Sequence, residues 1–330
     1  MSWWEPRTDV PLHEWRPSAF EMLPAALPEA RRVHDRIWVS TGLSHSWLIT
    51  TDDGRVIVNT GMGFESPVHK RNFDAVDDSP TRAIIFTQAH PDHVGGADHF
   101  REDGTELIAQ AGNAEHLEQD ARIAAYRQHR SDFAFADTVR DGAIRILKEF
   151  GGLPDQASPT PTITFDDRYE LTVGGVDLEL LATPGGETFE SLVVWLPRER
   201  VAICGNLFSA LTGHIPNLVT LRGDRYRNPL QFIESLERVR ALGAEMLLVS
   251  TSIDKVAINY RQPNQRDLDR MTVTEAREYM AAGHFAPGSM RPKIRAAIEF
   301  LEQGGKKVII TQPHLMEEAL HGRAGTHIVP

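Results

Sequence analysis

Cysteine, excess positive charge and long apolar runs are scarce or absent in the sequence, and each absence argues against a class of protein. Its only cysteine is Cys204, so it holds no internal disulfide and fits a reducing compartment. Its formal net charge of -11 argues against the basic surface that nucleic acids and anionic membranes require. No apolar run approaches the ~20 residues of a membrane span, and the first residues lack the basic and apolar regions of a secretory signal. We therefore expect a cytoplasmic protein without a nucleic-acid or membrane partner.

The composition is that of a folded protein, because 41% of the residues are hydrophobic and 25% are charged, enough for one large core or two domains. Apolar and β-branched runs predict strands at residues 36–39, 46–50, 55–59, 81–87, 104–109, 168–173, 176–181, 191–196 and 201–204. Helices are predicted at residues 113–130 and 228–243, with a proline-bearing loop at residues 151–161. Strands interrupted by helices are typical of an α/β or a layered α+β architecture.

The pattern changes after Gly243. Strands are predicted at residues 246–250 and 307–311, one helix after a capping box at residues 272–275, and another over residues 292–304. This alternation is that of a βαβ unit. We therefore predict a first domain of residues 1–245 and a smaller segment of residues 246–330.

The segment that points most clearly to chemistry is residues 87–96, Thr-Gln-Ala-His-Pro-Asp-His-Val-Gly-Gly, directly after a predicted buried strand. Gln88 and His90 are two residues apart, so they project the same way beyond the strand end. The proline that follows turns the chain and presents Asp92 and His93. Two imidazoles and a carboxylate are natural ligands for zinc, iron or manganese. An isolated histidine would be read as a polar residue at a strand end, but this dense cluster favours a metal site.

The segment resembles the His-x-His-x-Asp-His-x-Gly-Gly signature of the metallo-β-lactamase superfamily, with Gln88 in place of the first histidine. Residues 49–61 resemble the opening hairpin of that family, with Asn59 where aspartate is usual. Residues 183–188, Thr-Pro-Gly-Gly-Glu-Thr, fall where the family has its third metal histidine. Residues 204–206, Cys-Gly-Asn, fall where it has Gly-Asp, whose aspartate bridges two metals.

The departures from this signature matter as much as the matches. Weaker ligands stand at four positions: Gln88, Gly186, Asn206, and Ser250-Thr251-Ser252 where the last histidine is expected. Glu187 lies next to the lost third histidine, and its carboxylate can fill that gap; otherwise it is a solvated loop carboxylate. The Pro-Gly-x-Glu pattern is similar to the alkylsulfatase branch of the superfamily, in which glutamates supply ligands. That branch keeps an acidic bridging residue, which Asn206 is not.

The resemblance covers residues 30 to about 245 and implies an α/β fold, the αββα sandwich of the family. It implies a metal site made from Gln88, His90, Asp92, His93 and Glu187. Because the neutral Asn206 cannot bridge two dications, we predict one divalent ion, zinc first, with iron or manganese as alternatives. Asp92 is then a ligand or the base that orients the attacking water, and Asn206 hydrogen-bonds that water or the substrate. Three arginines are solvated, structural or anion-binding: Arg222, Arg225 and Arg227.

The end of the chain resembles a different family, carbamate kinase. The matching segments are residues 252–260, 263–265, 283–294 and 325–330. They cover only the C-terminal part of that kinase, which implies a smaller α/β segment with part of an amino-acid kinase fold and a lysine, Lys293, at a position near the phosphates. The glycine-rich loop and the carbamate-binding half are absent, and phosphoryl transfer needs many groups at once. We expect a structural or oligomerisation segment and a homodimer; retained nucleotide binding is the alternative.

These observations predict a metal-dependent hydrolase that uses activated water on a small-molecule substrate. The substrate is a small ester, with a sulfate ester favoured by the alkylsulfatase likeness, or an amide or carbamoyl compound suggested by the kinase-like segment. Two other classes of function remain open. The weakened ligand positions suit a non-catalytic binding protein on a decayed scaffold, and two histidines with a carboxylate also suit a non-haem iron redox protein.

Overall fold

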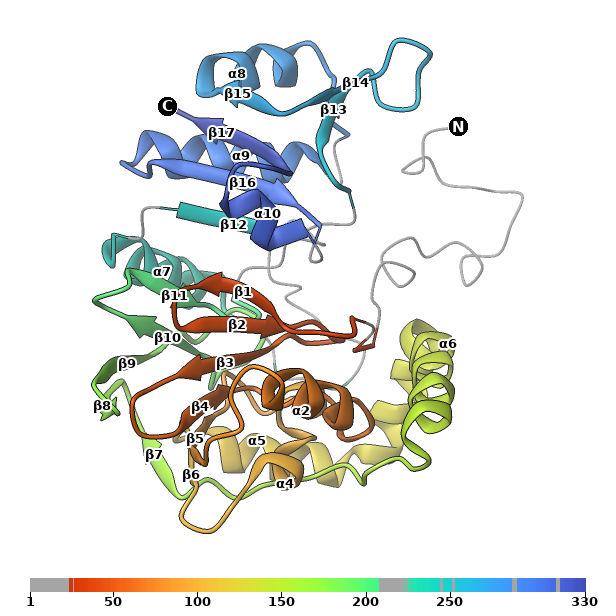
Figure 1. Ribbon diagram of the computed structural model, residues 1–330, viewed down its shortest axis with the longest axis vertical. Helices are drawn as coiled ribbons and strands as arrows, with labels where there is room; N and C mark the ends of the chain where they lie inside the picture. The colour runs from red at the N-terminus through yellow and green to blue at the C-terminus, as the bar shows by residue number, and fades with distance from the viewer. Residues whose placement is uncertain are drawn as a thin grey trace. The chain divides into compact units, whose positions relative to one another are not determined.

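The computed structural model describes residues 24–25, 27–207, 223, 225, 227–243, 246–250, 253–286, 290–312 and 315–330, without the side chains of residues 133, 134, 247–250 and 317. The described residues form two units (Figure 1). The larger unit contains the described residues from 24 to 207 and from 223 to 241. The smaller unit contains the described residues from 242 to 330.

The larger unit is built on a seven-stranded mixed sheet. In spatial order its strands are β1 (Arg31–His34), β2 (Ile37–Ser40), β3 (Ser46–Thr50), β4 (Arg55–Val58), β5 (Thr81–Ile85), β6 (Glu106–Gln110) and β7 (Ile163–Phe165). The first four strands pair antiparallel, and β4 to β7 pair parallel. β4 and β5 consist almost entirely of buried residues, as expected of parallel strands that are covered on both faces.

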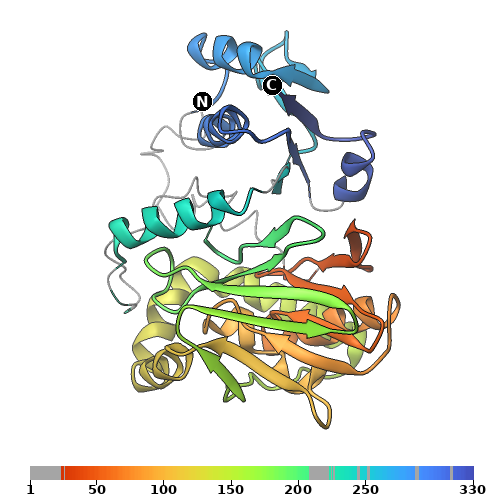
Figure 2. The ribbon, with the colours of Figure 1, turned by 90° about the vertical axis from the view of Figure 1, so that its left-hand side faces the viewer.

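A second, antiparallel sheet lies against the first, as Figure 2 shows for the green and orange strands. Its order is β11 (Val201–Ile203), β10 (Leu192–Leu196), β9 (Val176–Ala182), β8 (Arg168–Val173). One apolar cluster fills the space between the sheets and takes residues from both, among them Ile49, Val58, Ile85, Leu180 and Val194. This interdigitation of two inner faces is the packing expected of a β-sandwich core.

Helices cover the outer faces of the two sheets. They are α2 (Ser66–Asp74), α3 (Pro91–Val94), α4 (Ala97–Phe100), α5 (Asn113–Arg122), α6 (Ala124–Phe150) and α7 (Pro229–Ala241). Phe73 of α2 and Phe100 of α4 pack on Leu48 and Ile57 of the first sheet. α7 lies beside the second sheet, where Ser235 donates to the carbonyl of Pro184. The predicted αββα sandwich is therefore confirmed.

The predicted helix at residues 113–130 is only partly right. The chain breaks at Ile123, which ends α5, and α6 then continues to Phe150. Gly151 ends α6 with a φ of 75°, a left-handed conformation that glycine adopts without strain. The polar residues of α6 gave no apolar stripe regular enough to predict this extension.

The smaller unit is a four-stranded sheet with helices. Its strands lie in the order β12 (Met246–Ser250), β16 (Lys307–Thr311), β17 (Thr326–Val329), β15 (Arg270–Thr272), and a separate hairpin joins β13 (Val256–Ile258) to β14 (Arg266–Leu268). The helices are α8 (Val273–Ala281), α9 (Met290–Glu302) and α10 (Met316–Leu320). The predicted capping box is present, because Thr272 accepts from the Glu275 amide and Glu275 accepts from the Thr272 amide. The predicted small α/β segment is confirmed. Within the described residues, no helix of either unit is long and apolar enough to cross a membrane.

Candidate metal site

The predicted metal-binding segment lies where the sequence places it, directly beyond the buried strand β5. Gln88, His90 and His93 are all buried. His90 is the residue before α3, and the proline at the first position of α3 turns the chain as predicted. The short helix presents Asp92 and His93 from one turn, because His93 donates its backbone N–H to the His90 carbonyl at 2.9 Å.

Glu187 faces His90, although 97 residues separate them in the sequence. The Glu187 Oε1 atom lies 3.8 Å from His90 Nδ1. Gln88 joins the two, because its Nε2 atom lies 2.9 Å from His90 Nδ1 and donates to Glu187 Oε2 at 3.1 Å. Gln88 therefore enters the site as a hydrogen-bond donor rather than through its amide oxygen. Arg227 donates from Nε to the Glu187 backbone carbonyl at 3.0 Å, and its terminal nitrogen lies 3.7 Å from the Glu187 carboxylate.

The Glu187 carboxylate is held in its charged form. Burial by itself would raise its pKa, but the nearby His90 and the hydrogen bond from Gln88 outweigh burial, with His93 and Asn206 acting in the same direction. The result is a pKa of about 2. At neutral pH the site therefore contains an ionised carboxylate beside an imidazole.

Asp92 and His93 form a second pair of candidate metal ligands, after His90 and Glu187. The Asp92 Oδ2 atom lies 3.7 Å from His93 Nε2. Ser44 lies between them. Asn206 connects this pair to the first, because its Nδ2 atom lies 3.1 Å from His93 Nε2 and also donates to Glu187 Oε2. The two predicted catalytic residues, Asp92 and Asn206, are thus brought together with His93 at one site.

The His93 ring has polar partners at both of its nitrogens. Thr87 Oγ1 lies 3.3 Å from Nδ1 and accepts from Asn59 Nδ2 at 3.0 Å, whereas Nε2 faces Ser44 and Asn206. Either nitrogen of the neutral ring can hold the proton, and the other then offers its lone pair. Burial lowers the pKa of His93, against the opposing effect of the Asp92 and Glu187 carboxylates, so the ring is neutral at pH 7.

Some residues of this neighbourhood were not predicted. Glu190 is buried, accepts from the Ala89 amide at 3.2 Å and pairs with His116 Nδ1 at 2.7 Å. The His116 ring packs edge-on against His90, with centroids 5.2 Å apart. Glu190 follows Glu187 by three residues, which was a weak signal. Nothing in the sequence pointed to His116, on α5.

The remaining predicted residues fall in different places. Of the arginines, Arg227 lies at the site, whereas Arg225 contacts Glu115 and packs over the ring of Phe189. Arg222, Thr251 and Ser252 lie outside the described residues, and Ser250 is described only in its backbone.

The side chains of this site are of the chemical types that bind a divalent cation. In the described part of the chain, no three His, Cys, Asp or Glu side chains are close enough to hold an ion as they stand. Instead, the site contains two pairs of candidate ligand atoms. His90 Nδ1 and Glu187 Oε1 lie 3.8 Å apart, and His93 Nε2 and Asp92 Oδ2 lie 3.7 Å apart. Two ligands of one tetrahedral zinc ion lie ~3.4 Å apart, so each pair is wider by only a few tenths of an ångström. A neutral imidazole beside the ionised Glu187 carboxylate is a ligand set that zinc prefers.

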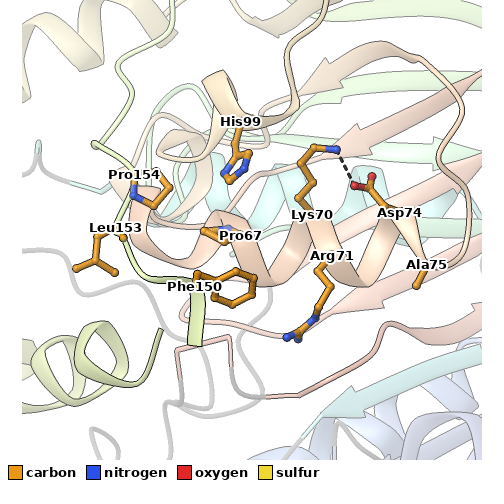
Figure 3. Close-up of a pocket in the computed structure, with 10 residues that line it drawn as sticks. Pro67, Lys70, Arg71, Asp74, Ala75, His99, Phe150, Leu153 and Pro154 are labelled. Atoms are coloured by element: carbon orange, nitrogen blue, oxygen red, sulfur yellow. Dashed lines mark hydrogen bonds and ion pairs between the residues drawn. The ribbon is translucent and has the colours of Figure 1, made fainter. Parts of the chain in front are cut away.

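A groove elsewhere on the larger unit contains none of the predicted site residues. It lies between α2 and the end of α6, and Figure 3 shows Lys70, Asp74 and His99 on one side and Phe150 and Leu153 on the other. Lys70 is paired with Asp74 at 2.7 Å, and Arg71 with Glu149. The positively charged side chains of the groove, Lys70 and Arg71, are therefore each paired with a carboxylate.

Comparisons with known proteins match each unit separately. The metallo-beta-lactamase superfamily model matches residues 39–250, and the amino acid kinase family model matches residues 238–312. The chain is 28% identical over 213 residues to the linear primary-alkylsulfatase of Pseudomonas sp., covering 61% of this chain and 40% of that protein. It is 49% identical over 90 residues to the carbamate kinase-like protein YahI of Escherichia coli, covering 27% of this chain and 28% of that protein.

Among solved structures, the stereoselective inverting sec-alkylsulfatase Pisa1 from Pseudomonas sp. matches with a TM-score of 0.51 and 19% identity, over 66% of this chain and 37% of that chain. At this identity the likeness concerns the fold alone. The chain spans less than half the length of each of these relatives.

Proposed function

Because this chain belongs to the metallo-beta-lactamase superfamily over residues 39–250, we propose that it is a metal-dependent hydrolase of a small ester. The observation that carries the proposal is the convergence of His90, Glu187, Asp92 and His93 at the end of β5, with Glu187 ionised and His93 neutral. Those are the protonation states in which these side chains bind a cation. We propose that His90, His93 and Glu187 hold one zinc ion, with iron or manganese as alternatives.

Each polar residue of the site has a part in this proposal. When bound, a divalent ion lowers the pKa of water and polarises the scissile group. The Asp92 carboxylate, 27% exposed against 17% for Glu187, is the more accessible of the two and accepts the proton of the attacking water. The Asn206 amide contacts both His93 and Glu187, one residue of each ligand pair, and orients that water. Gln88 keeps Glu187 aimed at the site through its hydrogen bond.

A sulfate ester is the substrate class that we favour. The alkylsulfatase relative is 28% identical over 213 residues, 61% of this chain. Arg227 supports an anionic substrate, because its nearly buried guanidinium lies beside the Glu187 carboxylate at the site. A planar guanidinium is well suited to the oxygens of a sulfate group. The kinase-like segment favours an amide or carbamoyl compound as the second candidate.

The test is hydrolysis by the full chain after removal of metal with a chelator and reloading with zinc, manganese or iron. Alkyl sulfates, carboxylate esters and carbamoyl compounds of matched chain length are assayed in parallel. We expect zinc to restore release of sulfate, and His93→Ala to prevent that restoration. His99→Ala is the matched control, because His99 contacts Ser66 and not the site. A protein that binds an ion but hydrolyses none of the compounds would contradict the proposal.

A further inference from the structure

Glu190 joins the segment that carries His90 to the helix α5. One of its carboxylate oxygens, Oε1, makes two contacts. It accepts from the backbone amide of Ala89 at 3.2 Å, and it lies 2.7 Å from Nδ1 of His116. Ala89 is the residue before His90, so the first contact fixes the backbone from which the His90 ring extends. Both partners are buried, because only 1% of the surface of Glu190 and 6% of that of His116 are exposed.

The second contact of Glu190 acts on the ring of His90. The rings of His116 and His90 pack edge to face, with centroids 5.2 Å apart and planes inclined by 80°. The His116 ring also stacks on Phe189, with centroids 5.6 Å apart. Because His116 is held at one nitrogen by Glu190 and covered by Phe189, it is a fixed neighbour that limits rotation of the His90 ring.

The stability of the fold does not explain this arrangement. The second oxygen of Glu190, Oε2, is buried and has no hydrogen-bond partner among the residues that the structure describes. The two buried residues of α5, Asn113 and His116, are polar as well. One turn after His116 lies Asp120, whose Oδ1 is 3.7 Å from His116 Nε2 and 3.1 Å from Arg127 of α6. Buried polar side chains cost free energy that apolar ones would not, so their gathering beside His90 points to a role at the site.

We propose that Glu190 and His116 are positioning residues for His90, and that together they fix the place and the rotation of the ring that binds the ion. The inference rests on the proposed function, because it requires that His90 is a ligand. One carboxylate oxygen holds both the backbone before His90 and the ring beside it. The 2.7 Å contact between Glu190 and His116 is a hydrogen bond whichever of the two carries the proton. A ligand that is held in advance loses little freedom when it binds an ion.

The test compares Glu190→Ala with Glu190→Gln in the full chain, with zinc affinity measured by competition with chelators of graded strength. Both variants remove the charge, but the glutamine oxygen can still accept from the Ala89 amide and from the His116 ring. We expect Glu190→Ala to bind zinc about 10-fold more weakly than Glu190→Gln. In a His90→Ala background the two should differ by less than about 2-fold, because the ring that Glu190 positions is gone. A general structural role would give the same difference in both backgrounds.

A loss of stability is separated from a loss of positioning by a control in the core. Phe73→Leu removes packing between α2 and α4, where Phe73 lies 6.2 Å from the ring of Phe100. It should lower the free energy of unfolding and leave the affinity for zinc unchanged.

His116 provides a second comparison in case the Glu190 variants fold poorly. His116→Phe keeps a ring beside His90 and His116→Ala does not, so the alanine variant should bind zinc about 3-fold more weakly, and only when His90 is present. Equal affinities within each pair of variants, or differences that persist without His90, would overturn the positioning role and leave the proposed function intact. A wild-type protein that binds no zinc, manganese or iron, or a His90→Ala variant with wild-type affinity, would overturn both.

Discussion

At the scale of single residues, the site depends on protonation states that its neighbours impose. The sequence contained enough to predict His90, Asp92 and His93, because they lie in one short segment after a strand, and Glu187, because it interrupts a familiar pattern. It contained no local signal for Ser44, which lies 48 residues before Asp92. Only the pairing of β2 and β3 in the sheet brings that loop to the end of β5. Contacts of this kind are set by topology rather than by periodicity.

Glu187→Gln should weaken metal binding by about 100-fold or more, because the change removes one of two carboxylates at the site and leaves a neutral amide. Zinc affinity, measured by competition with a chromophoric chelator, checks this expectation. Glu179→Gln is the control, because Glu179 pairs with Arg168 on the second sheet. Equal affinities in the two variants would show that Glu187 is not a ligand.

At the scale of elements, strands were predictable and one important helix was not. β3, β4 and β16 consist of apolar runs, and their predicted positions agree with the structure within one residue. α2 gave no apolar periodicity, because three of its buried residues are polar: Ser66, His69 and Asn72. These side chains face inward and find partners there, since His69 and Asn72 both hydrogen-bond with Ser40. A helix whose inner face is polar cannot be recognised from hydrophobicity.

The polar face of α2 makes folding stability depend on pH. Burial, with a contribution from His45, lowers the pKa of His69 from 6.5 to about 3. The unfolded chain therefore binds a proton in this range that the folded chain does not, so the stability that neutral His69 contributes is present above pH 6.5 and is lost as the pH falls toward 3. Between pH 7 and pH 5 the expected loss is roughly 2 kcal/mol.

Urea unfolding of His69→Gln at those two pH values isolates this effect, because the variant lacks the titrating group. Its free energy of unfolding should fall by roughly 2 kcal/mol less than that of the wild-type protein. His129→Gln, at an exposed position of α6, serves as the control and should follow the wild-type protein. A His69→Gln variant that loses as much stability as the wild-type protein over this interval would refute the assignment.

At the scale of the whole molecule, two family resemblances share one chain. Both could be predicted from the sequence, because each depends on contiguous motifs. The substrate could not, because the loops that line a pocket decide it and this fold hosts many chemistries. The chain also spans only 28% of the length of its carbamate kinase-like relative, so the smaller unit lacks most of that protein.

We propose that the full chain is a homodimer without kinase activity. A partial kinase fold has fewer elements to cover its sheet than a whole one, and a second copy can cover apolar surface left open. Light scattering coupled to size exclusion should give about twice the mass of one chain. Incubation with ATP and carbamate should give no phosphoryl transfer, because most of the groups that position the nucleotide and the acceptor are absent. A monodisperse monomer would refute the dimer, and phosphoryl transfer would refute the structural role.

The central claim is that one divalent ion binds at the end of β5 with His90 and His93 among its ligands. The most direct measurement is the metal content of the full chain, purified without added metal and dialysed, by mass spectrometry. We predict one equivalent of zinc per chain, because Asn206 offers no charge to bridge a second ion. His90→Ala and His93→Ala should stay folded and retain less than about one tenth of that metal. Two equivalents that survive dialysis, full metal in either variant, or no metal even after reloading with zinc, would contradict the account.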